Sequence, residues 1–241
     1  MPFINPQKTL NVNQIKDHTS EVYLWTEKKD GHYLQLHNGH AFTKTGRDLG
    51  PFPYSETLNP LSNYEVEAYG KNLAAAKSAL GKKLVPWHVL QYRLHNRIDY
   101  SLEYLVVNDS LWKLQNGILE YAPVLIIGTI QEAQAYAQTK IYPNGGEGLV
   151  GRLQSRSGYM SGCRNKTLVK IKSKEYLEAE VVAQTPGTEQ VFMRTKNGVL
   201  FSVKAMNRKI VVGKWYSVEC MKINPNGVPR EPTLMPCPLN N

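Results

Sequence analysis

The sequence predicts an α+β fold in two parts: a larger domain of antiparallel strands with a few helices, followed by a small β-barrel. Most of the chain consists of short runs in which apolar and polar residues alternate between turn residues, as expected for strands. Helical patterns occupy only three segments, all in the first part of the chain. After residue 178, short β-rich runs follow one another closely, which is typical of a small barrel.

The first part of the chain is expected to combine strands with helices. Asn38–Gly39 is a hairpin turn signal between the strand-like runs HYLQLHNG and HAFTKTG. The apolar run at 124–127 predicts a buried strand, and the proline-containing stretch 50–63 predicts a loop. Further strands are expected at residues 21–25, 64–68, 87–94, 149–153 and 168–172. Helices are expected at residues 72–80, 101–112 and 130–137.

The domain boundary is expected at 174–178, so that the chain divides into residues 1–175 and residues 176–241. Strands of the second domain are expected at residues 178–184, 191–195, 199–205, 209–213 and 216–223. The proline-rich tail from Asn224 is expected to be irregular.

The charge balance favours a polyanionic partner. Twenty-nine Lys and Arg face 20 Asp and Glu, a net charge of +9, which indicates nucleic acid before an anionic membrane. A basic protein without a specific partner is the alternative. No apolar run approaches the ~20 residues of a membrane span, and the N-terminus has no signal-peptide core. Three widely spaced cysteines argue against a zinc site or disulfide framework, and a reducing cytosol is expected.

The first candidate motif is Glu27-Lys28-Lys29-Asp30-Gly31. A lysine becomes a nucleophile when burial or a neighbouring cation lowers its pKa, and a lysine at a strand end before Asp and Gly could be held in that way. A solvated charged turn accounts for the same residues.

Two further motifs follow. Glu147, after Asn144-Gly145-Gly146, opens a strand where a carboxylate could hold Mg²⁺. An ordinary glycine-rich turn is equally compatible with that pattern. Strand alternation places Lys170 and Lys172 on one face, where a phosphate between them would relieve their repulsion. An exposed strand face is the alternative there.

The order and spacing of these motifs, together with Glu67, resemble the covalent nucleotidyltransferase superfamily, and within it the short ATP-dependent DNA ligases of bacteriophages and bacteria. The segment 159–164 resembles the Y-x-x-G-R tract of that family with one inserted residue, and 227–232 resembles its G-x-P-R-x-P tail. The resemblance covers nearly the whole chain. It implies a nucleotidyltransferase (ATP-grasp-like) domain over residues 1–175 and an OB-fold barrel over residues 176–241.

The resemblance also implies a reaction and its residues. Lys28 would take AMP from ATP, pass it to the 5′-phosphate at a nick, and the 3′-hydroxyl would then displace AMP. Lys170 and Lys172 would hold the α-phosphate, and Glu67 and Glu147 would hold Mg²⁺ (or Mn²⁺). The nucleotide-binding positions are then Glu27, Asp30, Gly31, Lys44, Glu67, Leu90, Glu147, Lys170 and Lys172.

Several positions depart from the family pattern. Tyr33 stands where the family has an arginine, and Lys44 replaces the arginine of a further motif, which loses the bidentate fork. Leu90 is in register with the aromatic residue that stacks on adenine, and Tyr92 lies two residues later. The C-terminal Asp-Lys pair of the family is absent, which leaves open how the OB-fold domain acts in the first step.

Nicked duplex DNA is the implied partner of a monomeric enzyme of a bacterial or phage-infected cytosol, in DNA replication or repair. No helical DNA-binding domain is expected ahead of Lys28, so contacts should come from basic side chains of the two domains. The expected DNA contacts are Arg47, Arg152, Arg156, Arg164, Lys166 and Arg230. An RNA ligase, a capping-type nucleotidyltransferase and a non-catalytic OB-type nucleic-acid-binding protein are the alternatives.

Overall fold

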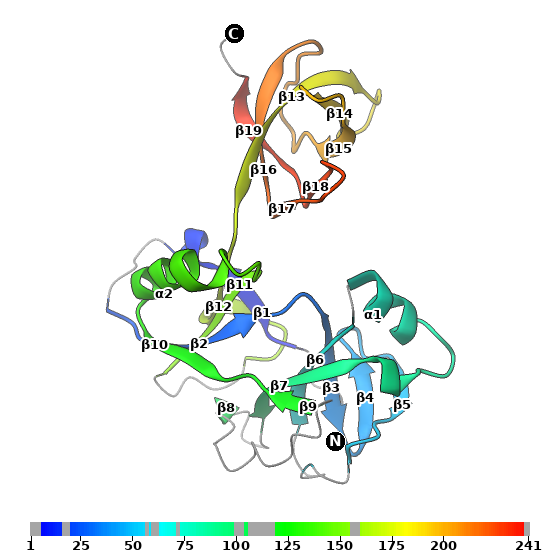
Figure 1. Cartoon of the computed structure of the whole chain (residues 1–241), viewed down its shortest axis with the longest axis vertical. Helices are drawn as coiled ribbons and strands as arrows, with labels where there is room; N and C mark the ends of the chain where they lie inside the picture. Colours follow the sequence, from blue (N-terminus) through cyan, green and yellow to red (C-terminus); the bar gives the residue numbers. More distant parts are fainter. Residues whose placement is uncertain are drawn as a thin grey trace. The chain divides into compact units, whose positions relative to one another are not determined.

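A computed structural model of the chain describes residues 6–15, 20–55, 58, 63–70, 73–98, 104–105, 119–154 and 160–238. The chain forms two compact units, Met1–Ile171 and Lys172–Asn241, so the division lies four residues before the predicted one (Figure 1). Strands predominate in both units and helices are few, as expected. No helix among the described residues is long and apolar enough to cross a membrane.

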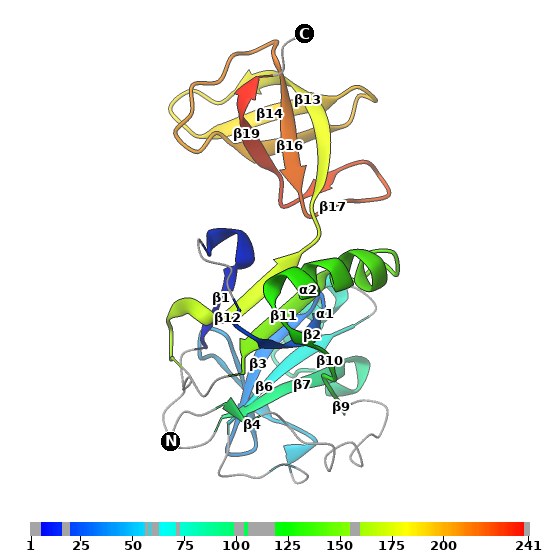
Figure 2. The same cartoon turned by 90° about the vertical axis from the view of Figure 1, so that its left-hand side faces the viewer.

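The first sheet of the N-terminal unit has five strands, and a helix packs on it. Its strand order is β1 (Lys8–Asn11), β12 (Arg164–Lys172), β11 (Gly148–Leu153), β2 (Tyr23–Lys28) and β10 (Val124–Gly128). Helix α2 (Ile130–Tyr136) continues as a π-helical turn over Ala137–Ile141 and lies against this sheet (Figure 2). Ile130 and Ala133 of the helix share a core with Trp25 and Leu149 of the strands. A short 3-10 turn, Val12–Gln14, follows β1.

The second sheet has one apolar and one polar face. Its strand order is β5 (Asp48–Pro51), β4 (His40–Thr43), β3 (His32–His37), β6 (Asn63–Tyr69), β7 (Gln91–Ile98) and β8 (Tyr104–Leu105), and β9 (Leu119–Tyr121) pairs with β7. Leu34 and Leu36 pack with helix α1 (Leu73–Leu80), whereas the alternate residues of β3 are polar. The predicted hairpin is confirmed: Asn38 and Gly39 both have positive φ, as a two-residue primed turn requires.

The C-terminal unit is a curved five-stranded sheet with a core of its own. Its strand order is β15 (Leu200–Lys204), β14 (Gln190–Thr195), β13 (Glu175–Gln184), β16 (Trp215–Cys220) and β19 (Thr233–Pro238). The edge strands β15 and β19 also contact one another, so the sheet curls toward closure. Strands β17 (Lys222–Ile223) and β18 (Pro229–Arg230) form a separate pair.

Two predictions for this unit are wrong. Residues 209–213 are not a strand: Val211 and Val212 are 46% and 58% exposed, and Gly213 has a φ of +82°. The fifth strand is β19, in the tail that was expected to be irregular. Leu234 of this strand is 1% exposed in the core, so burial rather than local composition selects the strand.

Four predictions for the first unit need correction. Trp87–Val89 form a 3-10 turn, and the strand begins only at Gln91. The strand at 124–127 is present but not buried, since it is a sheet edge with Ile127 59% exposed. Tyr104–Leu105 are a short strand where a helix was expected, and the rest of 101–112 lies outside the described residues. The expected loop 50–63 opens with the last residues of β5.

Candidate active site

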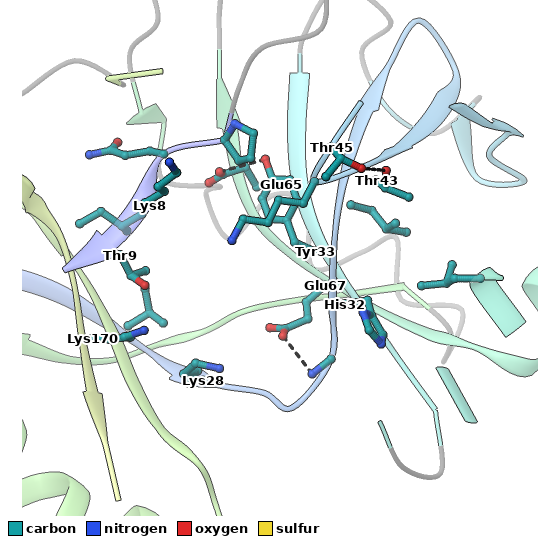
Figure 3. A pocket seen from close by; sticks show the side chains of 18 of the residues that line it. Lys8, Thr9, Lys28, His32, Tyr33, Thr43, Thr45, Glu65, Glu67 and Lys170 are labelled. Carbon is teal, nitrogen blue, oxygen red and sulfur yellow. Dashed lines mark hydrogen bonds between the residues drawn. The ribbon is translucent and has the colours of Figure 1, made fainter. Parts of the chain in front are cut away.

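A cavity of about 710 Å³ is lined by strands of both sheets and by helix α1 (Figure 3). The predicted site residues that line it are Lys28, Gly31, Lys44, Arg47, Glu67, Arg152, Arg164 and Lys170. The sequence had not singled out several others, among them Lys8, Thr9, His32, Glu65 and Lys77. Eight Lys and Arg face two Glu in this lining, so the cavity suits an anionic ligand.

Lys28 lies at the last position of β2 and pairs with a glutamate. Its Nζ is 2.7 Å from Glu147 Oε2, and the two side chains are 22% and 8% exposed. The strand register explains the meeting, because Lys28 lies opposite Gly148, the residue after Glu147. An ammonium group in an ion pair has no free electron pair. Lys28 must therefore release its proton and leave Glu147 before it can act as a nucleophile.

Gly31 lies where the chain passes from the first sheet to the second. Its N–H donates to Glu67 Oε1 at 3.0 Å. A Cβ at Gly31 would lie 2.6 Å from Glu67 Cγ and 2.7 Å from the carbonyl oxygen of Ala68, distances that no real Cβ tolerates. The motif glycine is therefore required by close backbone approach, and it fixes Glu67 relative to Lys28.

The side chains of β12 alternate between the core and the opposite face of the sheet, as predicted. Val169 and Ile171 are 0% and 5% exposed in the core under α2, whereas Lys170 lines the cavity on the opposite face. Lys172 belongs to the second unit, where its Nζ lies 3.1 Å from Glu231 Oε2. Of the two lysines predicted to share one phosphate, only Lys170 is thus in the cavity wall.

A charged network adjoins the nucleophile, and its central residue, Arg93, was not predicted. Arg93 is 7% exposed and donates to Glu120 Oε1 at 2.6 Å and to Glu27 Oε2 at 3.3 Å. Lys29 Nζ lies 2.7 Å from the same Glu27 oxygen. Glu27 is therefore fixed between two cations beside Lys28 and is not among the cavity-lining residues. The available signal was an arginine between two apolar residues, Tyr92 and Leu94, near the end of a predicted strand.

Glu120 is charged in this network. Burial opposes its ionisation, but hydrogen bonds from Tyr69 and Arg93 outweigh that effect and lower the pKa of the Glu120 carboxyl. Tyr69 donates its hydroxyl to Glu120 Oε1 at 2.7 Å, and burial together with that carboxylate raises the pKa of Tyr69. The Tyr69 phenol therefore stays protonated and the Glu120 carboxyl stays ionised, because the hydrogen bond between them stabilises both states.

Tyr33, at the position where the nucleotidyltransferases that the sequence resembles have an arginine, forms a hydrogen bond with a glutamate. The Tyr33 hydroxyl donates to Glu65 Oε1 at 3.2 Å, and Arg152 Nη2 lies 3.8 Å from Glu65 Oε2. Arg152 is 8% exposed and comes from β11 of the other sheet. It was expected to contact DNA, but the structure places its guanidinium in the cavity wall beside Tyr33.

The other predicted residues lie in different places. Leu90 and Tyr92 are 2% and 0% exposed in the core under α1, so neither presents a ring or chain to the cavity. Arg47 donates to the carbonyl oxygen of Leu80 at 2.8 Å, which ties the turn between β4 and β5 to the end of α1. Asp30 lies in the turn after β2 and does not line the cavity.

The remaining expected DNA contacts are spread over both units. Lys166 is exposed and its Nζ lies 2.5 Å from Glu21 Oε1. Arg230 is in the β17–β18 pair of the second unit, opposite Lys222. Arg156 lies outside the described residues, as does Tyr159 of the tract that resembles Y-x-x-G-R.

The carboxylates near Lys28 bear on the expected Mg²⁺ site. Glu67 lines the same cavity as Lys28, and Glu147 contacts Lys28 directly. Among the described residues no three His, Cys, Asp or Glu side chains gather as a metal-binding group. Mg²⁺ is commonly held by one or two carboxylates plus substrate phosphates, so the residues present fit a metal that arrives with its nucleotide.

Comparison with known proteins yields structural matches only. No known protein family and no curated protein matches the sequence. A solved structure from a structure–function analysis of Lig E DNA ligases, described as binding DNA with a minimal scaffold, superposes with a TM-score of 0.75 at 18% identity, over 98% of this chain and 99% of that one. A structure designated Pmar-Lig_Pre gives a TM-score of 0.72 at 11% identity, over 99% of this chain and 68% of that one.

A more distant match is the ATP-dependent DNA ligase from bacteriophage T7 in complex with ATP. Its TM-score is 0.54 at 11% identity, over 96% of this chain and 98% of that one. Both units take part in these superpositions, because nearly the whole chain is covered. The chain therefore has the fold of DNA ligases.

Proposed function

We propose that the chain is an ATP-dependent DNA ligase that seals nicks in duplex DNA through a lysyl-AMP at Lys28. The observation that carries the proposal is the position of Lys28 in a cationic cavity, with Glu147 in contact and Lys170 and Glu67 in the same wall. Residues from positions 28, 67, 147 and 170 converge there, which a coincidental charged turn at Lys28 would not require. The likeness of the fold to DNA ligases supports the same conclusion.

The reaction has three phosphoryl-group transfers. The neutral amine of Lys28 attacks the α-phosphorus of ATP and loses a proton; an N–P bond forms as the P–O bond to the pyrophosphate breaks, and pyrophosphate leaves with that electron pair. A 5′-phosphate oxygen at the nick then attacks the same phosphorus, which releases Lys28. The 3′-hydroxyl finally attacks the 5′-phosphorus, loses its proton and expels AMP. Each step needs in-line positioning and charge neutralisation more than new covalent machinery.

The cavity residues supply those two requirements. Lys170 lies where it can stabilise charge that develops on the α-phosphate oxygens. Glu67, held by Gly31, and Glu147, once it leaves Lys28, would hold Mg²⁺ together with the phosphates. The metal supplies charge neutralisation when bound. Lys44 and Arg152 add positive charge to the same wall.

The two units correspond in this proposal to a nucleotidyltransferase domain and an OB-fold domain. In the second unit, pairing runs β15–β14–β13–β16–β19, and β15 also meets β19, which is the circular order of a five-stranded barrel. The side chains that were expected to contact DNA then come from both domains, with Arg164 and Lys166 in the first and Arg230 in the second.

A sealing assay tests the function directly. Duplex DNA with one 5′-phosphorylated nick is incubated with the protein, Mg²⁺ and ATP, beside matched reactions with a nicked RNA strand and with GTP. The proposal predicts sealing of the DNA nick with ATP. Preferential sealing of RNA would identify an RNA ligase, use of GTP would indicate a capping-type enzyme, and binding of DNA without sealing would indicate a non-catalytic binder.

A further inference from the structure

Strand β1 contributes Lys8 to the wall of the cavity. The reaction described above does not use this lysine. Lys8 pairs with Arg164 and Asn11 pairs with Lys170 in the parallel ladder of β1 and β12. The Lys8 N–H donates to the carbonyl oxygen of Cys163 at 2.8 Å. Lys8 and Thr9 both line the cavity, and Figure 3 shows them on the same side as Lys28 and Lys170.

Gln7 fixes this segment from one end. Its side chain is buried, at 5% exposure, and its Nε2 donates to Asn165 Oδ1 at 2.9 Å and to Thr167 Oγ1 at 2.6 Å. Its Oε1 accepts from the Met160 N–H at 3.4 Å. A buried amide with donor and acceptor both satisfied is held in one orientation. All three partners lie in β12 or just before it.

Leu10 fixes the segment from the other end. It packs against the core under α2, next to the bulge that separates Thr9 from Leu10 in the ladder. Lys8 and Thr9 therefore lie between two anchored residues. A cation whose backbone is already ordered loses less entropy when it binds an anion, so this segment suits an ionic contact.

We propose that Lys8, with the Thr9 hydroxyl, forms a phosphate subsite in the cavity that is separate from the position of the α-phosphate beside Lys28 and Lys170. A lysine ammonium binds phosphate as a point charge, and a threonine hydroxyl can donate to a phosphate oxygen. The identity of the phosphate rests on the proposed function: it is either the pyrophosphate portion of ATP or the 5′-phosphate of the nick.

The test measures binding without turnover. Wild-type protein, Lys8→Met and the control Lys140→Met are compared; Lys140 is exposed and lies outside the cavity. The first arm titrates each protein with inorganic pyrophosphate by calorimetry. The second arm compares affinity for nicked DNA that carries a 5′-phosphate with affinity for the same nick carrying a 5′-hydroxyl.

Removal of one charge-assisted hydrogen bond should weaken binding about tenfold or more. Weaker pyrophosphate binding by Lys8→Met alone assigns the subsite to ATP, and disappearance of the preference for a 5′-phosphate assigns it to the nick. The proposal is overturned if Lys8→Met matches wild type in both arms, or if wild type binds neither probe. Because neither arm requires lysyl-AMP, failure of the proposed ligase activity would be recognised separately.

Discussion

Gly31→Ala is the substitution whose effect follows most directly from the structure. The added Cβ would lie 2.6 Å from Glu67 Cγ and 2.7 Å from the Ala68 carbonyl oxygen. The Glu67 chain can rotate away, but the Ala68 oxygen belongs to the backbone of β6 and cannot. Forced insertion of a methyl group into a tightly packed place costs about 1–3 kcal/mol. At about 2–4 °C per kcal/mol for a domain of this size, the melting temperature should fall by roughly 2–12 °C.

The same substitution should also impair chemistry at temperatures where the protein is folded. Movement of Glu67 breaks its bond with the Gly31 N–H and displaces a proposed metal ligand. The assay combines thermal unfolding with the rate of lysyl-AMP formation, and the control is Gly70→Ala, whose new Cβ would meet its nearest atom at an ordinary 3.5 Å. If Gly31→Ala melted and adenylated like Gly70→Ala, the close-approach reasoning would be refuted.

Three further predictions concern other parts of the site. Lys170→Ala should slow adenylation roughly 100-fold or more with an unchanged melting temperature; single-turnover kinetics check it, and a normal rate in the folded variant would contradict the role of the strand face. The lowered pKa of Glu120 predicts a contribution to stability that is full above its ordinary pKa of 4.5 and is lost as pH falls through its lower folded value. Glu120→Gln should therefore weaken the dependence of the melting temperature on pH below the ordinary pKa of the carboxyl, and an unaltered profile would exclude this linkage. The double variant Arg156→Ala/Lys166→Ala should bind nicked DNA with a weaker salt dependence. The slope of log affinity against log salt concentration should fall in magnitude by roughly 0.9 for each DNA phosphate that the variant no longer neutralises. An unchanged slope would show that neither residue contacts DNA phosphates.

Local sequence patterns predicted the parts of the site that lie within one strand or turn. The Asn38–Gly39 hairpin and the alternation around Lys170 follow from two-residue periodicity and turn chemistry, and both are present. Lys28 and Gly31 were selected because their motif, in order with the other motifs, resembles that of the covalent nucleotidyltransferases; the local pattern alone also allowed a solvated charged turn. Their partners, Glu147 and Glu67, were expected near the nucleotide, and the structure adds the contacts they make.

Residues that depend on pairing between distant segments could not be predicted. Lys8 reaches the cavity because β1 pairs with β12, more than 150 residues later in the chain, and no local pattern marks that pairing. Arg152 was expected to contact DNA, and its position in the cavity wall 3.8 Å from Glu65 depends on the pairing of β11 with β2, which no local pattern marks. The segment 209–213 is more strand-like in sequence than β19, but Leu234 of β19 is buried in the core of the second unit whereas Val211 and Val212 are exposed.

Covalent attachment of AMP to Lys28 is tested most directly by one mass-spectrometric measurement. Wild-type protein is incubated with ATP and Mg²⁺, its intact mass is measured, and the modified peptide is sequenced, with Lys28→Ala and Gly70→Ala treated alongside. We expect a gain of one adenylyl group on Lys28 in wild type and Gly70→Ala, and no gain in Lys28→Ala. An adenylyl group on any other residue, or none in wild type, would contradict it.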